Sequence, residues 1–174
     1  YSFFALYANI DNFDYSENII PLNKRVELDQ WILSELNSLI KNVEEKYNSF
    51  EPTMVARLIQ NFVTNKLSNW YVRLSRRRFW KGEYNKEKIA AYQTLFECLK
   101  SISVISAPIS PFFMDQLFQD LNNSTKKTNQ SSVHLCDFPV FNASMINPIL
   151  ERRMNLAQNI TSLALSLRKK EGLR

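Results

Sequence analysis

Glycine is nearly absent from this 174-residue chain, which contains only Gly82 and Gly172. Phosphate-binding loops and dinucleotide-binding turns need several glycines at fixed spacing, because the backbone must approach the phosphates closely there. Large β-sheet proteins also need turn residues such as glycine at short intervals. The scarcity of glycine therefore excludes a P-loop and a dinucleotide fingerprint within these residues, and it argues against a large sheet.

Histidine and cysteine are scarce as well. His134 is the only histidine, and the two cysteines, Cys98 and Cys136, are 38 positions apart. One histidine and one nearby cysteine cannot supply the ligands of a structural zinc site, and they do not indicate Cys–His catalysis. No His-Glu-x-x-His motif occurs. We therefore expect no metal site and no reaction centre, and we expect both cysteines to be reduced.

Long apolar runs are missing too. No stretch approaches 18 consecutive apolar residues, and the N-terminus has no basic segment followed by an apolar one. We therefore predict no transmembrane helix and no secretory signal, and the expected location is the cytoplasm. Position 1 is a tyrosine inside an apolar pattern, which predicts that the chain is part of a longer polypeptide. With 45% hydrophobic and 13% aromatic residues, the chain has the material for one buried core.

The positive charges are concentrated in two parts of the chain. The net charge is +5, yet residues 1–50 carry 4 basic and 8 acidic side chains, whereas residues 51–100 carry 10 basic and 4 acidic ones. Residues 151–174 carry 6 basic and 2 acidic side chains. This distribution is typical of a local contact with a polyanion. From charge alone, solvated helix faces are the simpler interpretation.

Apolar residues recur at steps of three and four, which is the pattern of amphipathic helices. Pro52, Pro111 and Pro148 stand where the first turn of a helix tolerates proline, and Asn85 is placed to cap a helix that is apolar on nearly all sides in its second half. We predict an all-α bundle of about five helices forming one domain over residues 1–174. The apolar positions that recur along one side of each predicted helix are Leu28, Ile32, Leu36, Leu39, Ile40, Val43, Tyr47; Val55, Leu58, Ile59, Phe62, Val63, Leu67, Trp70, Leu74; Ile89, Tyr92, Leu95, Phe96, Leu99, Ile102, Ile105; Phe113, Met114, Leu117, Phe118, Leu121; and Leu150, Met154, Ala157, Ile160, Ala164, Leu167.

Two segments lack the helical periodicity. Residues 122–132 are rich in Asn, Ser, Thr and Lys, and they are predicted to form a polar surface loop. Residues 132–141 alternate weakly and contain Pro139, which predicts an extended segment. A terminal helix is then predicted over residues 148–171.

The segment 69–81, Asn-Trp-Tyr-Val-Arg-Leu-Ser-Arg-Arg-Arg-Phe-Trp-Lys, carries the densest chemical pattern. Arginine suits phosphate because its planar guanidinium group donates two hydrogen bonds at once. An aromatic ring beside it can stack on an unpaired base. In a continuous helix, Arg73 and Arg77 stand at i and i+4, with Arg76 and Trp80 on the adjoining stripe.

Other interpretations remain open for this segment. Trp70 fits the core in line with Leu67 and Leu74, and Tyr71 fits it as well. Trp80 lies beyond the last periodic apolar position, next to Gly82 where we expect the chain to leave its helix, so both a core contact and a ligand contact fit it. The three consecutive arginines, residues 76–78, cannot all point inward, so some must face solvent, an acidic partner or a nucleic acid.

The same segment resembles the C-terminal helical domain of isoleucyl-tRNA synthetases, in Leu-Ser-Asn-Trp-Tyr-Val-Arg at 67–73 and in Arg-Arg-Arg-Phe-Trp at 76–80. Four further segments resemble that domain in the same order along the chain. They are Leu-Asp-Gln-Trp-Ile-Leu-Ser at 28–34 with Leu36 and Asn37, Ser-Ala-Pro-Ile-Ser-Pro-Phe-Phe at 106–113, Ser-Val-His-Leu at 132–135 with Phe138 and Pro139, and Ser-Leu-Arg-Lys-Lys-Glu-Gly-Leu-Arg at 166–174. Together the matches span nearly all of the chain.

The resemblance implies a domain that holds the anticodon stem–loop of an isoleucine tRNA. The catalytic domain of the same polypeptide would then join isoleucine to that tRNA with ATP and magnesium. The family's adenylation motifs, His-Ile-Gly-His and Lys-Met-Ser-Lys-Ser, do not occur in this sequence. We therefore expect this chain to be part of an enzyme, with its catalytic and editing domains upstream, and to carry no catalytic residue, cofactor or metal of its own.

The resemblance also implies which residues contact tRNA. In the methionine member of the class, a tryptophan at what looks like the place of Trp80 stacks on an anticodon base. The N-terminal helix would lie beside it and offer the amide groups of Asn9 and Asn12 to base edges. The predicted tRNA-binding residues are Asn9, Asn12, Arg73, Arg76, Arg77, Arg78, Trp80, Lys81, Arg168, Lys169 and Lys170. The alternatives are the same domain of a valine, leucine, methionine or cysteine tRNA ligase, and a helical scaffold that binds another protein through its basic face.

Overall fold

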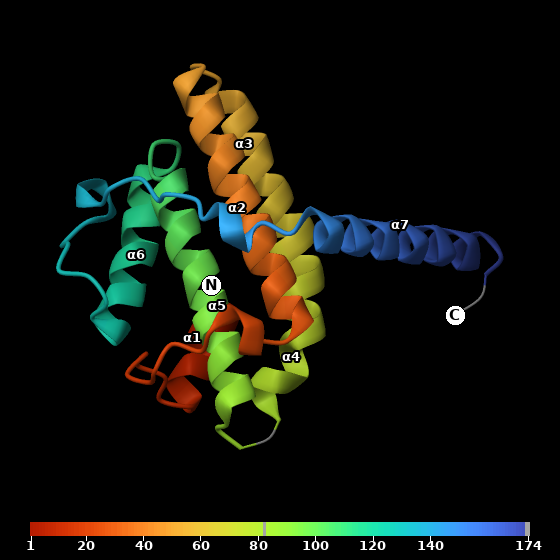
Figure 1. Cartoon of the computed structure of the whole chain (residues 1–174), viewed down its shortest axis with the longest axis horizontal. Coiled ribbons are helices and arrows are strands. Elements are labelled where there is room, and N and C mark those ends of the chain that lie inside the picture. Colours follow the sequence, from red (N-terminus) through yellow and green to blue (C-terminus); the bar gives the residue numbers. More distant parts are fainter. Residues whose placement is uncertain (82, 173–174) are drawn as a thin grey trace.

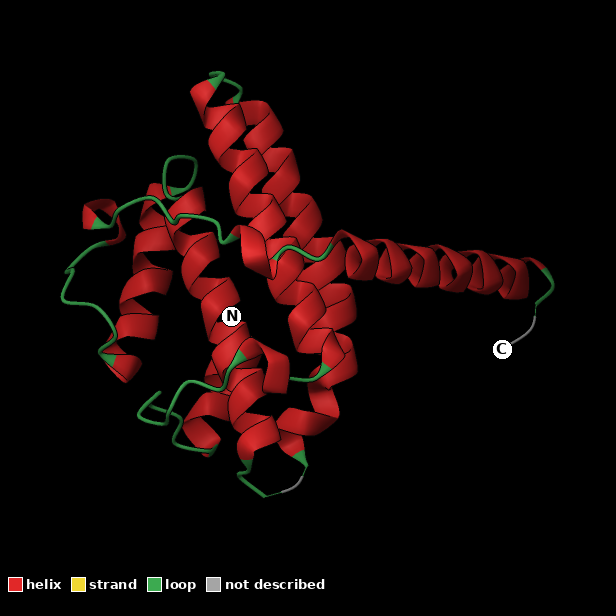
Figure 2. Ribbon diagram, in the orientation of Figure 1, coloured by secondary structure: helices red, strands yellow, loops and turns green. Residues whose placement is uncertain are grey.

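The structure, a computed structural model, describes residues 1–81 and 83–172, and within these ranges it contains helices and loops but no strand (Figure 2). The prediction of an all-α bundle is confirmed. The turn expected at Gly82 and the last two residues of the segment 166–174 lie outside the described residues. The α-helices are α1 (Ser2–Ile10), α2 (Glu27–Asn48), α3 (Pro52–Asn61), α4 (Arg73–Trp80), α5 (Lys86–Ser106), α6 (Pro111–Thr125) and α7 (Pro148–Lys170).

Helix α5 lies at the centre of the bundle. It is buried on nearly all sides because α1, α2, α3, α4 and α6 pack around it. The side chain of Asn85 caps its first turn by accepting a hydrogen bond from the backbone N–H of Lys88 at 3.0 Å, and the helix ends before Ala107 and Pro108. Both ends of α5 agree with the sequence prediction, because helix caps and prolines act locally. Its central position agrees as well, as predicted from its apolar second half.

The chain from Pro52 to Trp80 forms one continuous helical rod, in which α3 passes through a π-helix, η2 (Phe62–Val72), into α4 (Figure 1). A π-helix places more residues in each turn than an α-helix. The inward face therefore shifts by one residue relative to the α-helical prediction. Tyr71 and Ser75 are fully buried, whereas Trp70 is half-buried and Leu74 is 54% exposed. The prediction that Leu74 packs inside was wrong for this reason.

Helix α6 continues four residues into the segment predicted to be a loop and ends at Thr125, where Lys126 adopts a left-handed conformation with φ of 50°. The segment predicted to be extended contains a short 3-10 turn, η3 (Val133–Leu135). Asp115 of α6 attaches this turn to the bundle. Its carboxylate accepts hydrogen bonds from the Ser132 hydroxyl at 2.7 Å and from the Val133 backbone N–H at 2.8 Å.

Helix α7 leaves the bundle and projects away from it (Figure 1). A second 3-10 turn, η4 (Ala143–Met145), comes shortly before α7 in the chain. Only the first turns of α7 contact α2. Leu150 is buried, and the carboxylate of Glu151 accepts hydrogen bonds from the hydroxyls of Ser34 at 2.5 Å and Ser38 at 2.9 Å. Beyond these turns, residues 159–170 are all exposed. No helix in the described part of the chain is long and apolar enough to cross a bilayer.

A buried ion pair joins α2 to the rod. The carboxylate of Asp29, which is fully buried, accepts hydrogen bonds from both terminal nitrogens of Arg78, at 2.7 and 2.8 Å, and from the Tyr71 hydroxyl at 2.8 Å. Burial by itself lowers the pKa of Arg78, but the hydrogen bonds and charge of Asp29 outweigh this and leave the pKa raised. Burial, together with the charge of Asp29, raises the pKa of Tyr71 well above its ordinary value.

Replacing Asp29 with alanine is expected to lower the free energy of unfolding by about 3–5 kcal/mol, because it removes the buried counter-charge of a largely buried guanidinium group. Only the exposed carboxylate of Glu87, 3.3 Å from Nε of Arg78, then remains beside it. Urea unfolding followed by circular dichroism measures the change. Asp137→Ala removes an exposed carboxylate and serves as the control, with an expected change within about 0.5 kcal/mol. Equal, small changes for the two variants would contradict the role of the ion pair.

Candidate nucleic-acid interface

The exposed side of α4 presents cations and one indole ring. Ser75 and Phe79 occupy the inner side of the helix and are buried. The residues at steps of three and four on the other side are all exposed. We call these residues the α4 outer face; they are Arg73, Arg76, Arg77 and Trp80. The spacing inferred from the sequence therefore does bring these four side chains onto one stripe.

Arg78 does not belong to this stripe, although it was predicted with the others. Its side chain is only 14% exposed, and its guanidinium group binds the buried carboxylate of Asp29. It also donates a hydrogen bond to the backbone carbonyl of Glu87 at 3.0 Å. The positive charge of Arg78 is thus neutralised inside the protein, and its role here is to hold α4 against α2 and α5.

Trp80 and Lys81 end the stripe at the tip of the bundle. The indole of Trp80 is 54% exposed, and the ammonium group of Lys81 lies 5.0 Å from the centroid of that ring. A cation at this distance from an indole makes a favourable cation–π contact. The contact keeps a positive charge beside the exposed ring. A ring can stack on a base, and a neighbouring cation can neutralise the phosphate of the same nucleotide.

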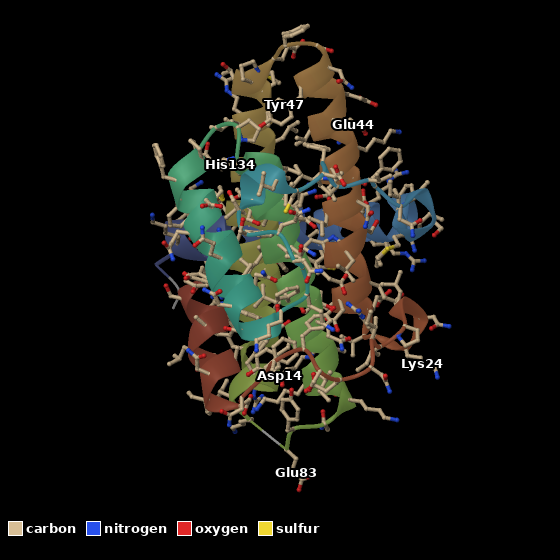
Figure 3. All side chains as sticks on the ribbon, turned by 90° about the vertical axis from the view of Figure 1, so that its left-hand side faces the viewer. Asp14, Lys24, Glu44, Tyr47, Glu83 and His134 are labelled. Atoms are coloured by element: carbon tan, nitrogen blue, oxygen red, sulfur yellow. The ribbon has the colours of Figure 1, made fainter. Side chains whose placement is uncertain are left out.

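Helix α1 packs against α4 and the start of α5. Phe3, in the first turn of α1, packs edge-on against Phe79, with ring centroids 5.1 Å apart. Just after α1, the carboxylate of Asp11 binds the Lys88 ammonium group at 2.6 Å and accepts a hydrogen bond from the Tyr92 hydroxyl at 2.5 Å. These contacts hold the end of α1 against the start of α5. Figure 3 shows Asp14, in the loop after α1, and Glu83, in the loop after α4, both toward this end and opposite Glu44 and Tyr47.

Asn9 and Asn12 both lie on this held segment and are exposed. Asn12 adopts a left-handed conformation, with φ of 53°, which asparagine tolerates better than most residues. Both residues are therefore accessible to solvent, and Asn9 lines a small cleft between α1 and α6 together with Asp120 and Ser124. No hydrogen bond between them and the α4 outer face is present among the described residues.

The three basic residues at the end of α7 are exposed but stand apart from this surface. Arg168, Lys169 and Lys170 occupy the last turn of a 23-residue helix, which at 1.5 Å per residue is about 34 Å long. Figure 1 shows that this turn lies far from α4. The structure therefore separates the predicted residues into a set at the end of the bundle and a set at the tip of α7.

Sequence reasoning missed Tyr84 and Asn85 at the end of the bundle. Tyr84 is 41% exposed and donates a hydrogen bond to the carboxylate of Glu17. Asn85 lines an open polar cleft of about 230 Å³ between α4 and the start of α5, together with Arg77 and Lys81. Both residues stand outside the dense segment 69–81. In the sequence, Asn85 was singled out only as a helix cap, and Tyr84 only lies in the loop that connects two predicted helices.

This arrangement is suited to binding a polyanion with accessible bases. Guanidinium and ammonium groups neutralise phosphates, an exposed indole stacks on a base, and amide groups hydrogen-bond to base edges. Within residues 1–81 and 83–172 there is no group of three or more His, Cys, Asp or Glu that could hold a metal ion.

Comparison with known proteins gives a family match over most of the chain. The model of the family described as the anticodon-binding domain of tRNA ligase matches residues 29–174. The isoleucine–tRNA ligase of Cytophaga hutchinsonii is 56% identical over 174 residues, which are 100% of this chain and 16% of that protein. The isoleucine–tRNA ligase of Bacteroides thetaiotaomicron is 52% identical over 100% of this chain and 15% of its own length. That of Dehalococcoides mccartyi (strain CBDB1) is 44% identical over 100% of this chain and 17% of its own length. The chain thus spans about a sixth of the length of these curated relatives.

Truncating Trp80 is expected to cost little stability, whereas truncating its neighbour Phe79 is expected to cost much. Phe79 is 1% exposed and packs against Phe3 and Tyr92, so Phe79→Ala should lower the free energy of unfolding by about 3–5 kcal/mol. Trp80→Ala removes a side chain that is half in solvent and should cost less than about 1 kcal/mol. Thermal and urea unfolding of both variants measure this. A comparable loss in both would place Trp80 in the core.

Proposed function

Because this chain belongs to the family of anticodon-binding domains of tRNA ligases, we propose that it is the anticodon-binding domain of an isoleucine–tRNA ligase. In this proposal the domain holds the anticodon stem–loop of an isoleucine tRNA, so that the acceptor end reaches the catalytic domain of the same polypeptide. The observation that carries the proposal is the 56% identity to an isoleucine–tRNA ligase over the whole chain. The exposed cations and indole at one end of the bundle supply the matching chemistry.

The aminoacylation itself belongs to the rest of the proposed ligase. The residues of this chain do not fit ATP or magnesium, because no phosphate-cradling glycine turn exists in the sequence and no group of metal ligands occurs among the described residues. We place the use of ATP with magnesium, and the activation of isoleucine, in the catalytic domain. The location that fits this function is the cytoplasm, where tRNA is charged.

The proposed site divides the work among three kinds of group. Arg73, Arg76 and Arg77 neutralise phosphates of the anticodon arm, because their side chains are exposed on the α4 outer face and form no ion pair within residues 1–81 and 83–172. Trp80, with Lys81 beside it, stacks on an unpaired base of the loop. The amides of Asn9 and Asn12 contact base edges from the neighbouring segment.

Arg168, Lys169 and Lys170 have a different place in this proposal. Because they lie at the tip of α7, away from the α4 outer face, we assign them to phosphates elsewhere on the tRNA. Arg78 is left out, since its charge is taken up by Asp29. A protein-binding scaffold would use the same basic surface for acidic side chains. Binding to an acidic protein of similar charge with the same affinity as tRNA would favour that function instead.

Trp80→Ala is expected to weaken binding of an isoleucine tRNA transcript by about 1–3 kcal/mol, the value of stacking one base on an aromatic side chain. Fluorescence anisotropy titration at fixed salt measures the affinity. The matched control is Phe50→Ala, which removes an aromatic ring that is 92% exposed at the turn between α2 and α3, at the other end of the bundle. An equal loss in the control, or no loss in Trp80→Ala, would refute the stacking role.

The double variant Arg76→Ala/Arg77→Ala is expected to reduce the salt dependence of tRNA binding. Each neutralised phosphate contributes about 0.7–0.9 to the slope of log affinity against log salt, so the slope should become shallower by about one to two units. The control is Lys41→Ala/Arg57→Ala, which removes two exposed charges in α2 and α3. If both double variants keep the parent slope and a native circular dichroism spectrum, the two arginines do not contact phosphate.

A further inference from the structure

The outward side of α7 carries an apolar stripe that nothing in the described structure covers. Its members are spaced by seven, four, three and four residues, and each is 58–68% exposed. At 100° per residue they fall within an arc of about 60°, which is the narrow seam by which one helix packs against another. We call them the α7 stripe; they are Ile149, Leu156, Ile160, Leu163 and Leu167.

The α7 stripe points away from the bundle. The residues that attach α7 to α2 are Leu150, Glu151 and Met154, of which Leu150 is buried and Met154 packs on the core. On the helix these three positions lie on roughly the opposite side from the stripe. The stripe therefore cannot be covered by closing α7 further onto the face that it already uses.

The middle of α7 is also uncharged. The 14 residues from Met154 to Leu167 include no Asp, Glu, Lys or Arg, although residues 159–167 are all exposed. A helix that remains in water is usually charged on its solvent side, and exposed apolar patches of this length mark interaction sites. The charges of α7 stand at its two ends, in residues 151–153 and 168–170, and they bracket the apolar stretch.

We propose that the α7 stripe is the docking surface for the segment of the same ligase that follows residue 174, and that this segment packs an apolar helix or sheet face along α7. The inference rests on the proposed function, because it takes the chain to be part of a full-length ligase. The curated relatives are about six times as long as this chain, so the proposed ligase contains polypeptide beyond these 174 residues. The stripe runs to within three residues of the end of α7, and its last member, Leu167, is seven positions before residue 174.

The chemistry of the stripe favours this occupant over the others. RNA is disfavoured because phosphates need cations, and Met154–Leu167 offers none. A second copy of the chain is disfavoured because a segment joined to α7 has an effective concentration of the order of millimolar, which a second molecule does not reach. The segment upstream of Tyr1 starts elsewhere, since the Tyr1 hydroxyl is held by Asp120 of α6 at 2.9 Å.

Hydrogen–deuterium exchange of the complete ligase and of the 174-residue chain tests the proposal. The amides of residues 156–167 are expected to exchange at least about tenfold more slowly in the complete ligase, because packing suppresses opening of the helix. In the complete ligase, Leu156→Gln/Leu163→Gln should return these amides to the faster exchange. The matched control is Leu165→Gln, which changes a side chain that is 55% exposed on another side of α7 and should leave the protection intact.

Each other outcome overturns the proposal. Equal, fast exchange in both proteins means that the stripe is uncovered. Protection of the 174-residue chain that rises with its concentration means that a second copy covers it, and protection that appears only with tRNA means that RNA does. A ligase that lacks residues after 174 yet keeps the protection would assign the stripe to the upstream domains. Failure of the proposed function is seen separately, as the absence of salt-dependent binding of an isoleucine tRNA transcript by the parent protein.

Discussion

The carboxylate of Asp29 has to be paired, and much of the arrangement around it follows from that requirement. A buried charge is tolerated only when counter-charge and hydrogen bonds surround it, and Asp29 obtains both from Arg78 and Tyr71. Two residues of the rod are thereby drawn toward α2, and the rotation of the rod about its own axis is set. Once Arg78 faces inward, Arg76 and Arg77 must face outward. The exposure of Arg76 and Arg77 thus follows from the burial of Arg78.

The π-helix η2 and an aromatic cluster complete this orientation. The wide turns of η2 bring Tyr71, Ser75 and Phe79 to the inside at intervals of four residues. Phe79 then meets Tyr92 of α5 edge-on at 5.0 Å, and Tyr92 stacks on Phe13, after α1, at 4.8 Å. Aromatic pairs at these distances add to the stability that burial already provides. They hold α1, α4 and α5 together at one end, so that polar groups from distant parts of the chain share one surface.

The first turns, the middle and the last turn of α7 differ in their contacts and charge. Its first turns are attached to α2 through Leu150 and Glu151, whereas its middle is apolar, uncharged and exposed and its last turn is basic. A recognition domain has to present its binding groups on a rigid support, because misplacement weakens binding. The bundle provides that support for the α4 outer face. For α7 the proposed support is the segment that packs along the α7 stripe.

The sequence by itself determined the helices, their caps and the all-α class, because apolar spacing, Asn85 and the prolines at 52, 111 and 148 act within a few residues. It also placed Arg73 and Arg77 on one stripe and Arg76 and Trp80 on the adjoining one, since a helix of known pitch is enough to place them. Tertiary structure alone decided that Arg78 is buried and Leu74 exposed. Those outcomes depend on the long-range pairing with Asp29 and on the width of η2, and neither leaves a local pattern. One signal was present and unused: Asp29 lies three, four and seven positions before Ile32, Leu33 and Leu36, which are buried. A carboxylate in that position on an apolar face requires a buried cation, and only the folded chain shows which of the neighbouring arginines supplies it.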